Sequence, residues 1–436
     1  MIRPKSPISL QIELTDFCNH NCVHCYNFWR TDDSWKKEAD KVNGKKLLDI
    51  ADKIIDAEVF HVVLTGGEPL VVPLHMLEPL VKKYRDNNVS VSMNSNITLV
   101  TPEHVDFLKK YGLGILTSII SSDENEFDSV TQKKGSFKKF NDKLELLTKN
   151  DIHVSANMVV DKSRVSKVYE TGKLAYSLGV KGFCATRMSP SNENIKNYKS
   201  AVLDNNDITS MFDQLLALEK NFGIPVATLN AIPYCALDNP EKYSSLLHRS
   251  CMAGLTSAGV SSKGELRSCQ HFNTSGGNVL SENIRDIWDK MFSWRQEYIS
   301  QSSCKSCIEC THCGGGCREN ALKMSGELFG EDSVKRTPLT KRLSSSNATE
   351  NIDAIKIYPR MKYRNEEFGG ILFKNAGAYG FVDLFSFETI KNLYSRDVIT
   401  QNDIIEIGSN LPFVNKQYTN NLFNNLVNNK IAYKEN

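Results

Sequence analysis

The first 185 residues alternate between short strand-like runs and longer segments with one apolar helical face. Residues 7–15 switch between apolar and polar side chains, which is the period of a β-strand. Residues 46–57 place their apolar side chains at helical spacing instead. Continued along the chain, the pattern predicts strands at 59–64, 89–93, 114–120, 153–160 and 180–185, and helices at 75–87, 136–148 and 165–178.

Strands that alternate with helices of this length predict repeated βα units and a parallel sheet. About six such units fit before residue 230, which is fewer than the eight of a closed barrel. In parallel α/β folds the chemistry lies at the carboxyl ends of the strands. Three segments fall at such ends here: the loop with the first cysteines, residues 66–69 and residues 94–96.

The rest of the chain changes character twice. Helical periodicity fades after residue 230 while cysteine and glycine become frequent, which predicts a small metal-held domain over residues 231–335. Residues 336–350 are polar and predict a linker. Residues 351–436 resume mixed structure, with a hairpin at 368–384 and helices at 386–394, 400–407 and 417–428. We therefore expect three domains, over residues 1–230, 231–335 and 351–436.

Composition narrows the class of protein. The chain has 436 residues, of which 40% are hydrophobic and 24% charged, and these globular values exclude a disordered or fibrous protein. A net charge of +2 gives no broad attraction to nucleic acid or to an anionic membrane. The sequence contains neither an apolar run of membrane-spanning length nor a signal-peptide pattern. We expect a cytoplasmic protein with no nucleic-acid or membrane partner.

The 12 cysteines are grouped rather than scattered. Cytoplasmic thiols stay reduced, so such groups indicate metal binding or redox chemistry before disulfides. In the first group, Cys18, Cys22 and Cys25 share one loop after a predicted strand. Three thiolates at this spacing can bind three irons of a [4Fe-4S] cluster and leave the fourth iron open for chemistry. The alternative is a zinc site completed by His20 or His24.

This cysteine spacing, with an aromatic residue after the last cysteine, resembles the radical S-adenosylmethionine (SAM) superfamily. The resemblance implies that the open iron binds SAM. One electron from the cluster, supplied by a flavodoxin- or ferredoxin-like donor, then splits SAM into methionine and a 5′-deoxyadenosyl radical. That radical removes a hydrogen atom from the substrate.

Further segments match the same superfamily in the expected order. Residues 66–69 resemble its GGEP motif, which contacts SAM, and residues 92–96 resemble its third strand end. Ser118 occupies the place of a ribose-binding serine, and Arg187 lies where it could pair with a carboxylate. The implied SAM-binding residues are Gly66, Gly67, Glu68, Pro69, Asn96, Ser118 and Arg187.

The later cysteines resemble the SPASM extension of radical SAM peptide-modifying enzymes, which carries auxiliary [4Fe-4S] clusters. Cys251 is followed by twelve residues, then Gly264, then four residues and Cys269. Five more cysteines follow within residues 304–317. The resemblance implies one or two auxiliary clusters, bound by Cys251, Cys269, Cys304, Cys307, Cys310, Cys313 and Cys317. Zinc ribbons are the alternative.

By analogy, Cys304, Cys307 and Cys313 hold a distal cluster, for which Cys310 is a possible fourth ligand. Cys251, Cys269 and Cys317 hold a proximal cluster, which has an open iron or takes Cys235 as its fourth ligand. The last cysteine of the family pattern belongs near Lys335, but no cysteine follows Cys317.

The position after Cys269 bears on the type of substrate. Sulfatase-maturing members of the family have a proton-accepting Asp there, whereas this chain has Gln270 and His271. Glutamine accepts no proton at neutral pH, while histidine can. His271 is therefore the candidate catalytic residue, and a sulfatase-maturing activity is less favoured.

Residues 351–436 resemble the winged-helix recognition module of ribosomal-peptide maturases, which binds a leader peptide as an added strand. A winged helix that binds DNA would need a basic recognition helix, and the predicted helices lack one. A helical cap on the barrel is the remaining alternative.

Together these features predict an α/β protein: a partial (β/α)6 TIM-like barrel, a SPASM domain and a winged-helix-like domain. The expected function is radical modification of a ribosomally synthesised precursor peptide, through a thioether or carbon–carbon crosslink. Alternatives are a related enzyme that acts on a folded protein or a small metabolite, and an iron–sulfur electron carrier without enzymatic activity.

Overall fold

A computed structural model describes residues 3–27, 42–189, 198–247, 250–291, 303–327, 329–343 and 350–435. The chain divides into two compact units. One comprises residues 10–344, and the other comprises residues 345–436 together with residues 1–9. The division falls within the predicted linker, of which residues 344–349 lie outside the described part. The boundary expected at residue 230 stays a prediction.

The larger unit is built on a ten-stranded sheet with the order β10-β9-β8-β1-β2-β3-β4-β5-β6-β7. From β2 to β7 the neighbouring strands pair in parallel. The strands of this part are β1 (Ser9–Glu13), β2 (His61–Thr65), β3 (Ser90–Ser95), β4 (Gly114–Ser118), β5 (Val154–Val160), β6 (Gly182–Arg187) and β7 (Val226–Ala227). They confirm the predicted parallel sheet and place the polar strand ends along one edge.

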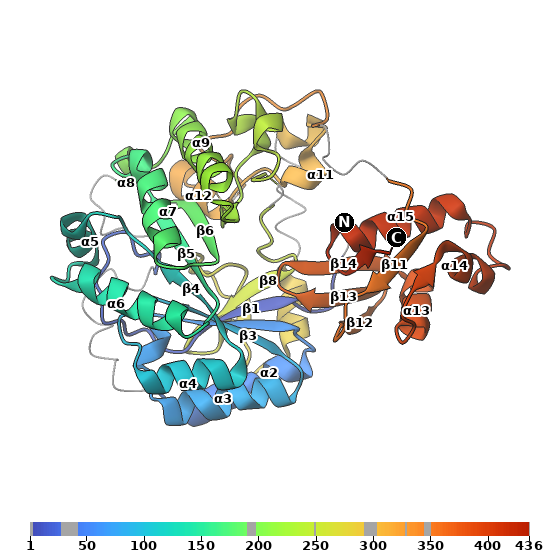
Figure 1. Cartoon of the computed structure of the whole chain (residues 1–436), viewed down its shortest axis with the longest axis horizontal. Helices are drawn as coiled ribbons and strands as arrows, with labels where there is room; N and C mark the ends of the chain where they lie inside the picture. The colour runs from blue at the N-terminus through green and yellow to red at the C-terminus, as the bar shows by residue number, and fades with distance from the viewer. Residues whose placement is uncertain are drawn as a thin grey trace. The chain divides into compact units, whose positions relative to one another are not determined.

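Helices cover the outer side of the curved sheet (Figure 1). They are α2 (Gly44–Asp56), α3 (Leu74–Asp86), α4 (Pro102–Tyr111), α5 (Glu124–Thr131), α6 (Ser136–Lys149), α7 (Val168–Ser177), α8 (Tyr198–Ala201) and α9 (Asn205–Phe222). Their apolar faces bury side chains such as Ile54, Leu144 and Leu215 completely. Burial of such side chains against the sheet stabilises the fold by about 1.5–3 kcal/mol each. The sequence pattern had not predicted α4, α5, α8 and α9.

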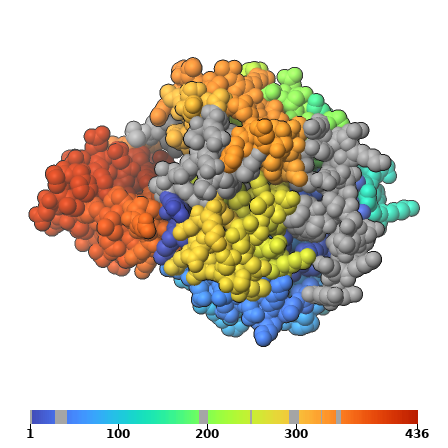
Figure 2. Space-filling view, turned by 180° about the vertical axis from the view of Figure 1, so that it is seen from behind, coloured from blue at the N-terminus to red at the C-terminus, as the bar shows by residue number. Residues whose placement is uncertain are grey.

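The cysteine-rich part of this unit extends the same sheet. Strands β8 (Ser257–Val260), β9 (Glu265–Arg267) and β10 (Gly277–Asn278) pair in antiparallel fashion beyond β1. Figure 2 shows this segment in yellow beside the blue helices near the N-terminus, where Arg285 pairs with Glu58 at 2.5 Å. Two short helices follow, α11 (Cys310–Cys313) and α12 (Arg318–Ser325).

The smaller unit has its own core. Strands β12 (Lys362–Glu366), β13 (Gly369–Asn375) and β14 (Ala378–Asp383) form an antiparallel sheet. A second small sheet contains β11 (Ala354–Ile357), β15 (Ile399–Thr400) and β16 (Ala432–Lys434), and the helices are α13 (Leu384–Leu393), α14 (Gln401–Ile407) and α15 (Lys416–Asn428). The predicted hairpin and three helices are confirmed. A side chain at Gly370 would meet the Phe387 ring at 2.0 Å, so this glycine lets α13 pack closely on β13.

The N-terminal segment joins the smaller unit through Arg364, which is 2% exposed. The Arg364 guanidinium donates to the Ser6 hydroxyl at 2.6 Å, to the Ser6 carbonyl at 2.8 Å and to the Pro7 carbonyl at 3.1 Å. Glu366 accepts from the same guanidinium at 2.6 Å and from the Lys5 backbone N–H at 2.8 Å. Both ends of the chain are therefore fixed in one unit.

Across the described ranges, no helix combines the length and the apolar character that crossing a bilayer demands.

Candidate active site and cysteine groups

The loop that carries Cys18, Cys22 and Cys25 follows β1 directly. Its backbone is fixed to the end of α5, because Asn21 N–H donates to the Thr131 carbonyl at 3.1 Å and Val23 N–H to the Val130 carbonyl at 3.0 Å. Cys18 is 8% exposed, and the other two thiols are half-buried. The His20 backbone N–H also donates to the Cys18 sulfur at 3.4 Å. Hydrogen bonds thus hold the loop in one conformation at the carboxyl edge of the sheet.

The glycines after β2 allow this loop to approach. Gly67 N–H donates to the Thr15 carbonyl at 2.7 Å, and Glu68 N–H donates to the Phe17 carbonyl at 2.8 Å. A Cβ atom on Gly67 would lie 2.0 Å from the Phe17 carbonyl oxygen, so no side chain fits there. In the structure these glycines make room for the chain itself, immediately before Cys18.

Glu68 fixes the end of the neighbouring strand. It is 1% exposed, and its carboxylate accepts from the Ser95 hydroxyl at 2.6 Å, the Asn96 N–H at 2.8 Å and the Leu70 N–H at 3.1 Å. Burial raises the pKa of Glu68 to about 7, while these hydrogen bonds oppose the rise. The carboxylate is therefore occupied with holding the β2 and β3 ends together.

Asn96 connects this strand end to the cysteine loop. Its side-chain amide donates to the Asn19 side chain at 2.8 Å and reaches the Cys18 sulfur at 3.8 Å. Its side-chain oxygen accepts from the Thr98 N–H at 3.0 Å. The structure thus joins three of the segments that sequence analysis had singled out: the cysteine loop, residues 66–69 and Asn96.

The two histidines of the loop have other partners. The His24 ring nitrogen lies 3.4 Å from both terminal nitrogens of Arg164, and burial together with that charge lowers the pKa of His24 to about 3. The His20 ring contacts the Thr98 hydroxyl at 3.4 Å. Nowhere in the described ranges do three Cys, His, Asp or Glu side chains surround one point as a single metal ion requires. Zinc and a cubane both stay predictions for this loop.

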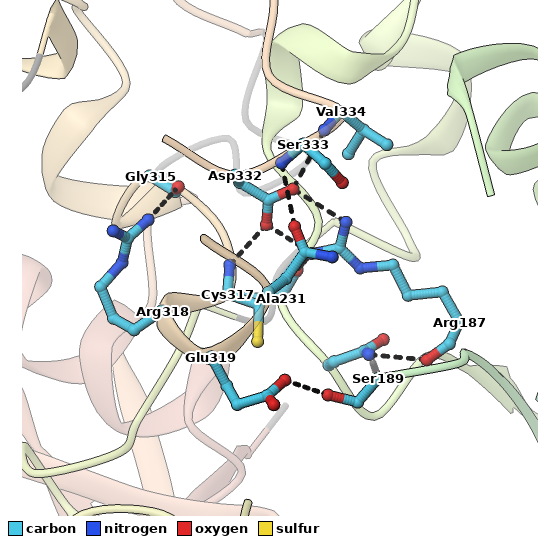
Figure 3. A network of polar contacts seen from close by, with 12 residues as sticks. Arg187, Ser189, Ala231, Gly315, Cys317, Arg318, Glu319, Asp332, Ser333 and Val334 are labelled. Carbon is cyan, nitrogen blue, oxygen red and sulfur yellow. Dashed lines mark hydrogen bonds and ion pairs between the residues drawn. The ribbon is translucent and has the colours of Figure 1, made fainter. Parts of the chain in front are cut away.

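Ser118 and Arg187, the other predicted SAM contacts, differ in their surroundings. Ser118 is exposed at the end of β4, opposite Asn157 of β5, and its predicted role stays open. Arg187 is 1% exposed and already engaged (Figure 3). It binds Asp332 through both terminal nitrogens, one at 2.8 Å, and the Ala231 carbonyl at 3.1 Å. A SAM contact would require this pair to separate, so we do not propose it.

Asp332 also orders the loop before Cys317. Its second carboxylate oxygen accepts from the Cys317 N–H at 2.7 Å. Gly314, Gly315 and Gly316 all have left-handed φ angles, of 65°, 73° and 86°. A Cβ atom on Gly316 would lie 2.5 Å from the Asp332 carboxylate and 2.7 Å from the Pro233 ring. Close packing therefore requires a glycine at 316, while the left-handed φ angles favour glycine at 314 and 315.

Cys251, Cys269 and Cys317 form the proximal group. Burial is the main cause that raises the pKa of Cys269, and the charges of Cys251 and Cys317 raise it further. Burial and the charge of Cys251 raise the pKa of Cys317 to about 12. Glu319 lies near Cys317, as Figure 3 shows, and is 2% exposed. Its carboxylate accepts from the Ser189 hydroxyl, and its other oxygen has no hydrogen-bond partner in the described part of the chain.

The distal group lines one cavity, together with Tyr234, Glu309 and Lys335. Its thiols are those of Cys235, Cys304, Cys307, Cys310 and Cys313. Cys235 is thus placed with the distal group, whereas sequence analysis had weighed it as a proximal ligand. The position of Cys235 in the chain, shortly before Cys251, had suggested the proximal group. In the structure the short helix Tyr234–Ala236 packs over Cys313 instead, and the Cys313 sulfur accepts from the Tyr234 N–H at 3.5 Å.

His271 and Gln270 follow Cys269 in different environments. The His271 ring stacks on Tyr26, with centroids 4.4 Å apart and planes 5° from parallel. Burial, reinforced by Arg267, lowers the pKa of His271 to about 4, so the ring is neutral at pH 7. Gln270 is buried and donates to the Gln11 carbonyl of β1 at 2.8 Å. Gln270 therefore joins the hairpin to the sheet, and His271 keeps its place as the predicted catalytic candidate.

Several residues of these sites escaped sequence analysis. Asp332, Glu319 and Lys335 stand singly in a polar region, and no local pattern separates them from surface charges. The same holds for Glu13 and Arg267, which pair at 2.5 Å with both side chains 1% exposed. One signal in the sequence was available for Glu13, because it is a charged residue in a strand whose other side chains mostly face the core.

Comparison with known proteins places these features in a family context. Residues 12–174 match the model of the Radical SAM superfamily. The AdoMet-dependent heme synthase of Methanosarcina barkeri is 24% identical over 75% of this chain and 95% of its own length. The mycofactocin maturase MftC of Mycolicibacterium smegmatis is 26% identical over 75% of this chain and 82% of its own. The fold resembles Streptococcus suis SuiB bound to precursor peptide SuiA, with a TM-score of 0.58, 18% identity, and coverage of 76% of both chains.

Proposed function

We propose that this chain, an enzyme with a radical SAM domain over residues 12–174, modifies a ribosomally synthesised precursor peptide. Two comparisons support the substrate class, since MftC is named a maturase and SuiB has been solved with its precursor peptide. The observation that carries the chemistry is the joining of the Cys18 loop to Gly67, Glu68 and Asn96 by hydrogen bonds at one sheet edge. That edge is where parallel α/β folds bind ligands.

The three thiols of the loop would hold the [4Fe-4S] cluster. When bound, that cluster and SAM supply the 5′-deoxyadenosyl radical that removes a substrate hydrogen atom. Cys18, Cys22 and Cys25 provide three ligands and leave one iron for SAM. Glu68 and Asn96 would act by positioning, because their polar atoms hold the β3 end and the Cys18 loop in register. Ser118, exposed at the next strand end, remains available to a nucleotide ribose.

The cysteine-rich region would hold auxiliary [4Fe-4S] clusters. Its thiols form two groups, around Cys317 and around Cys313, and buried thiols are deprotonated when they bind a metal. Crosslink formation, as a thioether or a carbon–carbon bond, removes two hydrogen atoms from the peptide. The 5′-deoxyadenosyl radical takes one as a hydrogen atom, and the second leaves as a proton and an electron. An auxiliary cluster would accept that electron.

The smaller unit would recognise the leader part of the peptide. Its sheet has two edges, β12 and β14, and β14 has β13 as its one strand partner in the described ranges. β12 carries Arg364 and Glu366, which already hold residues 5–7. An extended peptide can add to a sheet edge through backbone hydrogen bonds. β14 is therefore the proposed docking strand, and the exposed Leu384 directly after it offers an apolar contact.

A small-molecule substrate is the second candidate, because a relative is named a heme synthase. That relative is matched over 95% of its length but covers 75% of this chain, so a quarter of the chain has no counterpart in the match. The maturase MftC also covers 75% of this chain, so coverage does not separate the two candidates, and the peptide is favoured because the separate unit over residues 345–436 offers a second binding site. The peptide therefore remains the favoured substrate.

The test is anaerobic reconstitution with iron, sulfide, SAM and a reductant. We expect 5′-deoxyadenosine from the wild type and none from the Cys18→Ala/Cys22→Ala/Cys25→Ala variant. A peptide encoded beside the gene should lose two hydrogen atoms by mass spectrometry when incubated with the wild type. Lack of 5′-deoxyadenosine would refute the radical chemistry, and its formation with no change in any neighbouring peptide would refute the substrate class.

A further inference from the structure

The distal cysteine group has one thiol more than a cubane needs. Cys304, Cys307, Cys310 and Cys313 follow one another at intervals of three residues, and Cys235 approaches them from a remote segment. The family pattern supplies the fourth ligand from a cysteine near residue 335, where this chain has Lys335. Two candidates can replace that missing cysteine, namely Cys310 from the same run and Cys235 from the segment after β7.

The position of the Cys235 sulfur separates the two candidates. The backbone N–H of Arg336, the residue after Lys335, donates to the Cys235 sulfur at 3.4 Å. Cys235 therefore lies in space where the family pattern would place its last cysteine, although it is 100 residues away in sequence. Cys235 also lines the same cavity as Cys304 and Cys307. Its neighbour Tyr234 donates to Cys313 from the same direction.

Cys310 is less suited to the remaining corner. It begins the short helix α11, which ends at Cys313, so both thiols come from one turn of backbone. Ligands from one short run cover one side of a cubane, and iron–sulfur proteins commonly take the fourth thiolate from a distant segment. A thiol from a remote segment that lines the same cavity meets that need, and Cys235 is the described cysteine that provides it.

We propose that Cys235 is the fourth ligand of the distal auxiliary cluster, with Cys304, Cys307 and Cys313, and that Cys310 is not required. Backbone N–H groups at Arg336 and Tyr234 would stabilise the thiolates of Cys235 and Cys313 by hydrogen bonds. Lys335, which stands where the family pattern has a cysteine, lines the same cavity, and its ammonium group pairs with Glu331 at 2.7 Å. The assignment rests on the proposal that this region binds a cluster.

The experiment compares Cys235→Ala with Cys310→Ala in the full-length protein after anaerobic reconstitution. Iron and sulfide per chain, and the electron paramagnetic resonance (EPR) signal of a three-iron cluster after mild oxidation, are measured without reference to activity. We expect Cys235→Ala to lose about one iron per chain and to show the three-iron signal. Cys310→Ala should match the wild type in both measurements. A SAM-dependent change in the spectrum of the N-terminal cluster serves as the check that each variant is folded.

Two further results define failure. If Cys310→Ala loses iron, alone or together with Cys235→Ala, or if Cys235→Ala keeps its full iron content, the ligand assignment is wrong. A Cys304→Ala/Cys307→Ala variant separates this failure from that of the proposed function. Unchanged iron content in that variant would mean that the cavity binds no cluster. If that variant loses iron while Cys235→Ala keeps its full iron content, the cavity binds a cluster but Cys235 is not its ligand. Cys235→Ser, which keeps a weaker oxygen ligand, should shift the cluster potential instead of releasing all the iron.

Discussion

Arg187 and Asp332 form a two-pronged ion pair with side chains 1% and 0% exposed, between the end of β6 and the loop after α12. The same carboxylate accepts the backbone N–H of Cys317. A charge on a barrel strand therefore fixes the position of a cysteine in the proximal group. This relationship gives Arg187 a structural role at a strand end, and it leads to the first prediction.

Arg187→Met should destabilise the protein by about 3–5 kcal/mol, because Asp332 would stay buried without its counter-charge. Urea unfolding of the variant and the wild type measures this change in the free energy of unfolding. The double variant Arg187→Met/Asp332→Leu should recover part of the loss, since it leaves no unpaired charge. If Arg187→Met kept its stability and lost affinity for SAM instead, the originally predicted SAM contact would be correct.

Gly67→Ala should prevent assembly of the N-terminal cluster and spare the auxiliary clusters. The added Cβ would overlap the Phe17 carbonyl, so the chain before Cys18 must move away. We expect reconstituted protein to lose about four irons per chain and to stop forming 5′-deoxyadenosine. Gly135→Ala is the control, because a Cβ there meets no atom within 4 Å and only its left-handed φ angle of 76° opposes it. Equal iron loss in both variants would contradict the prediction.

Gly316→Ala and Gly314→Ala form a matched pair on one loop. Both residues have left-handed φ angles, so both substitutions carry a similar backbone cost of about 1 kcal/mol. In Gly316→Ala the new Cβ also collides with Asp332 and Pro233, whereas in Gly314→Ala its nearest neighbour is the Ser250 side chain at 3.5 Å. Gly316→Ala should therefore release auxiliary iron and lower the unfolding temperature more than Gly314→Ala does. The opposite order would show that packing around Asp332 is unimportant.

Glu68 should make stability fall as pH rises. Its folded-state pKa of about 7 exceeds the ordinary value of 4.5, so the folded protein holds this proton more tightly than the unfolded chain. The stabilisation is complete below pH 4.5 and is lost as pH rises through about 7, to a total of about 3 kcal/mol.

Glu68→Gln provides the comparison, because glutamine does not titrate. Any hydrogen bonds that the variant loses lower its stability by the same amount at every pH. Unfolding free energies of both proteins should be measured from pH 5 to pH 8. The wild type should lose stability relative to Glu68→Gln across this range. Parallel curves would show that Glu68 has an ordinary pKa in the folded protein.

Local features of the fold were predictable because their causes are local. Apolar spacing of 2 or 3.6 residues predicted β2 to β6, half of the helices around them, and the hairpin and three helices of the smaller unit. The carboxyl ends of parallel strands share one edge, so their order alone brought Cys18, residues 66–69 and Asn96 together. Helices such as α5, with few apolar side chains on a short face, escaped detection.

By itself, the sequence determined the order of the βα units, the grouping of the cysteines and the kind of chemistry those groups suit, since spacing and residue type act over a few neighbours. The tertiary structure alone decided that Cys235 joins the distal thiols, that Arg187 pairs with Asp332, and that residues 5–7 belong to the smaller unit. Each of these is a contact between segments about 70 or more residues apart. Such contacts are set by how whole elements pack and bury charge, and no short stretch of sequence encodes that packing.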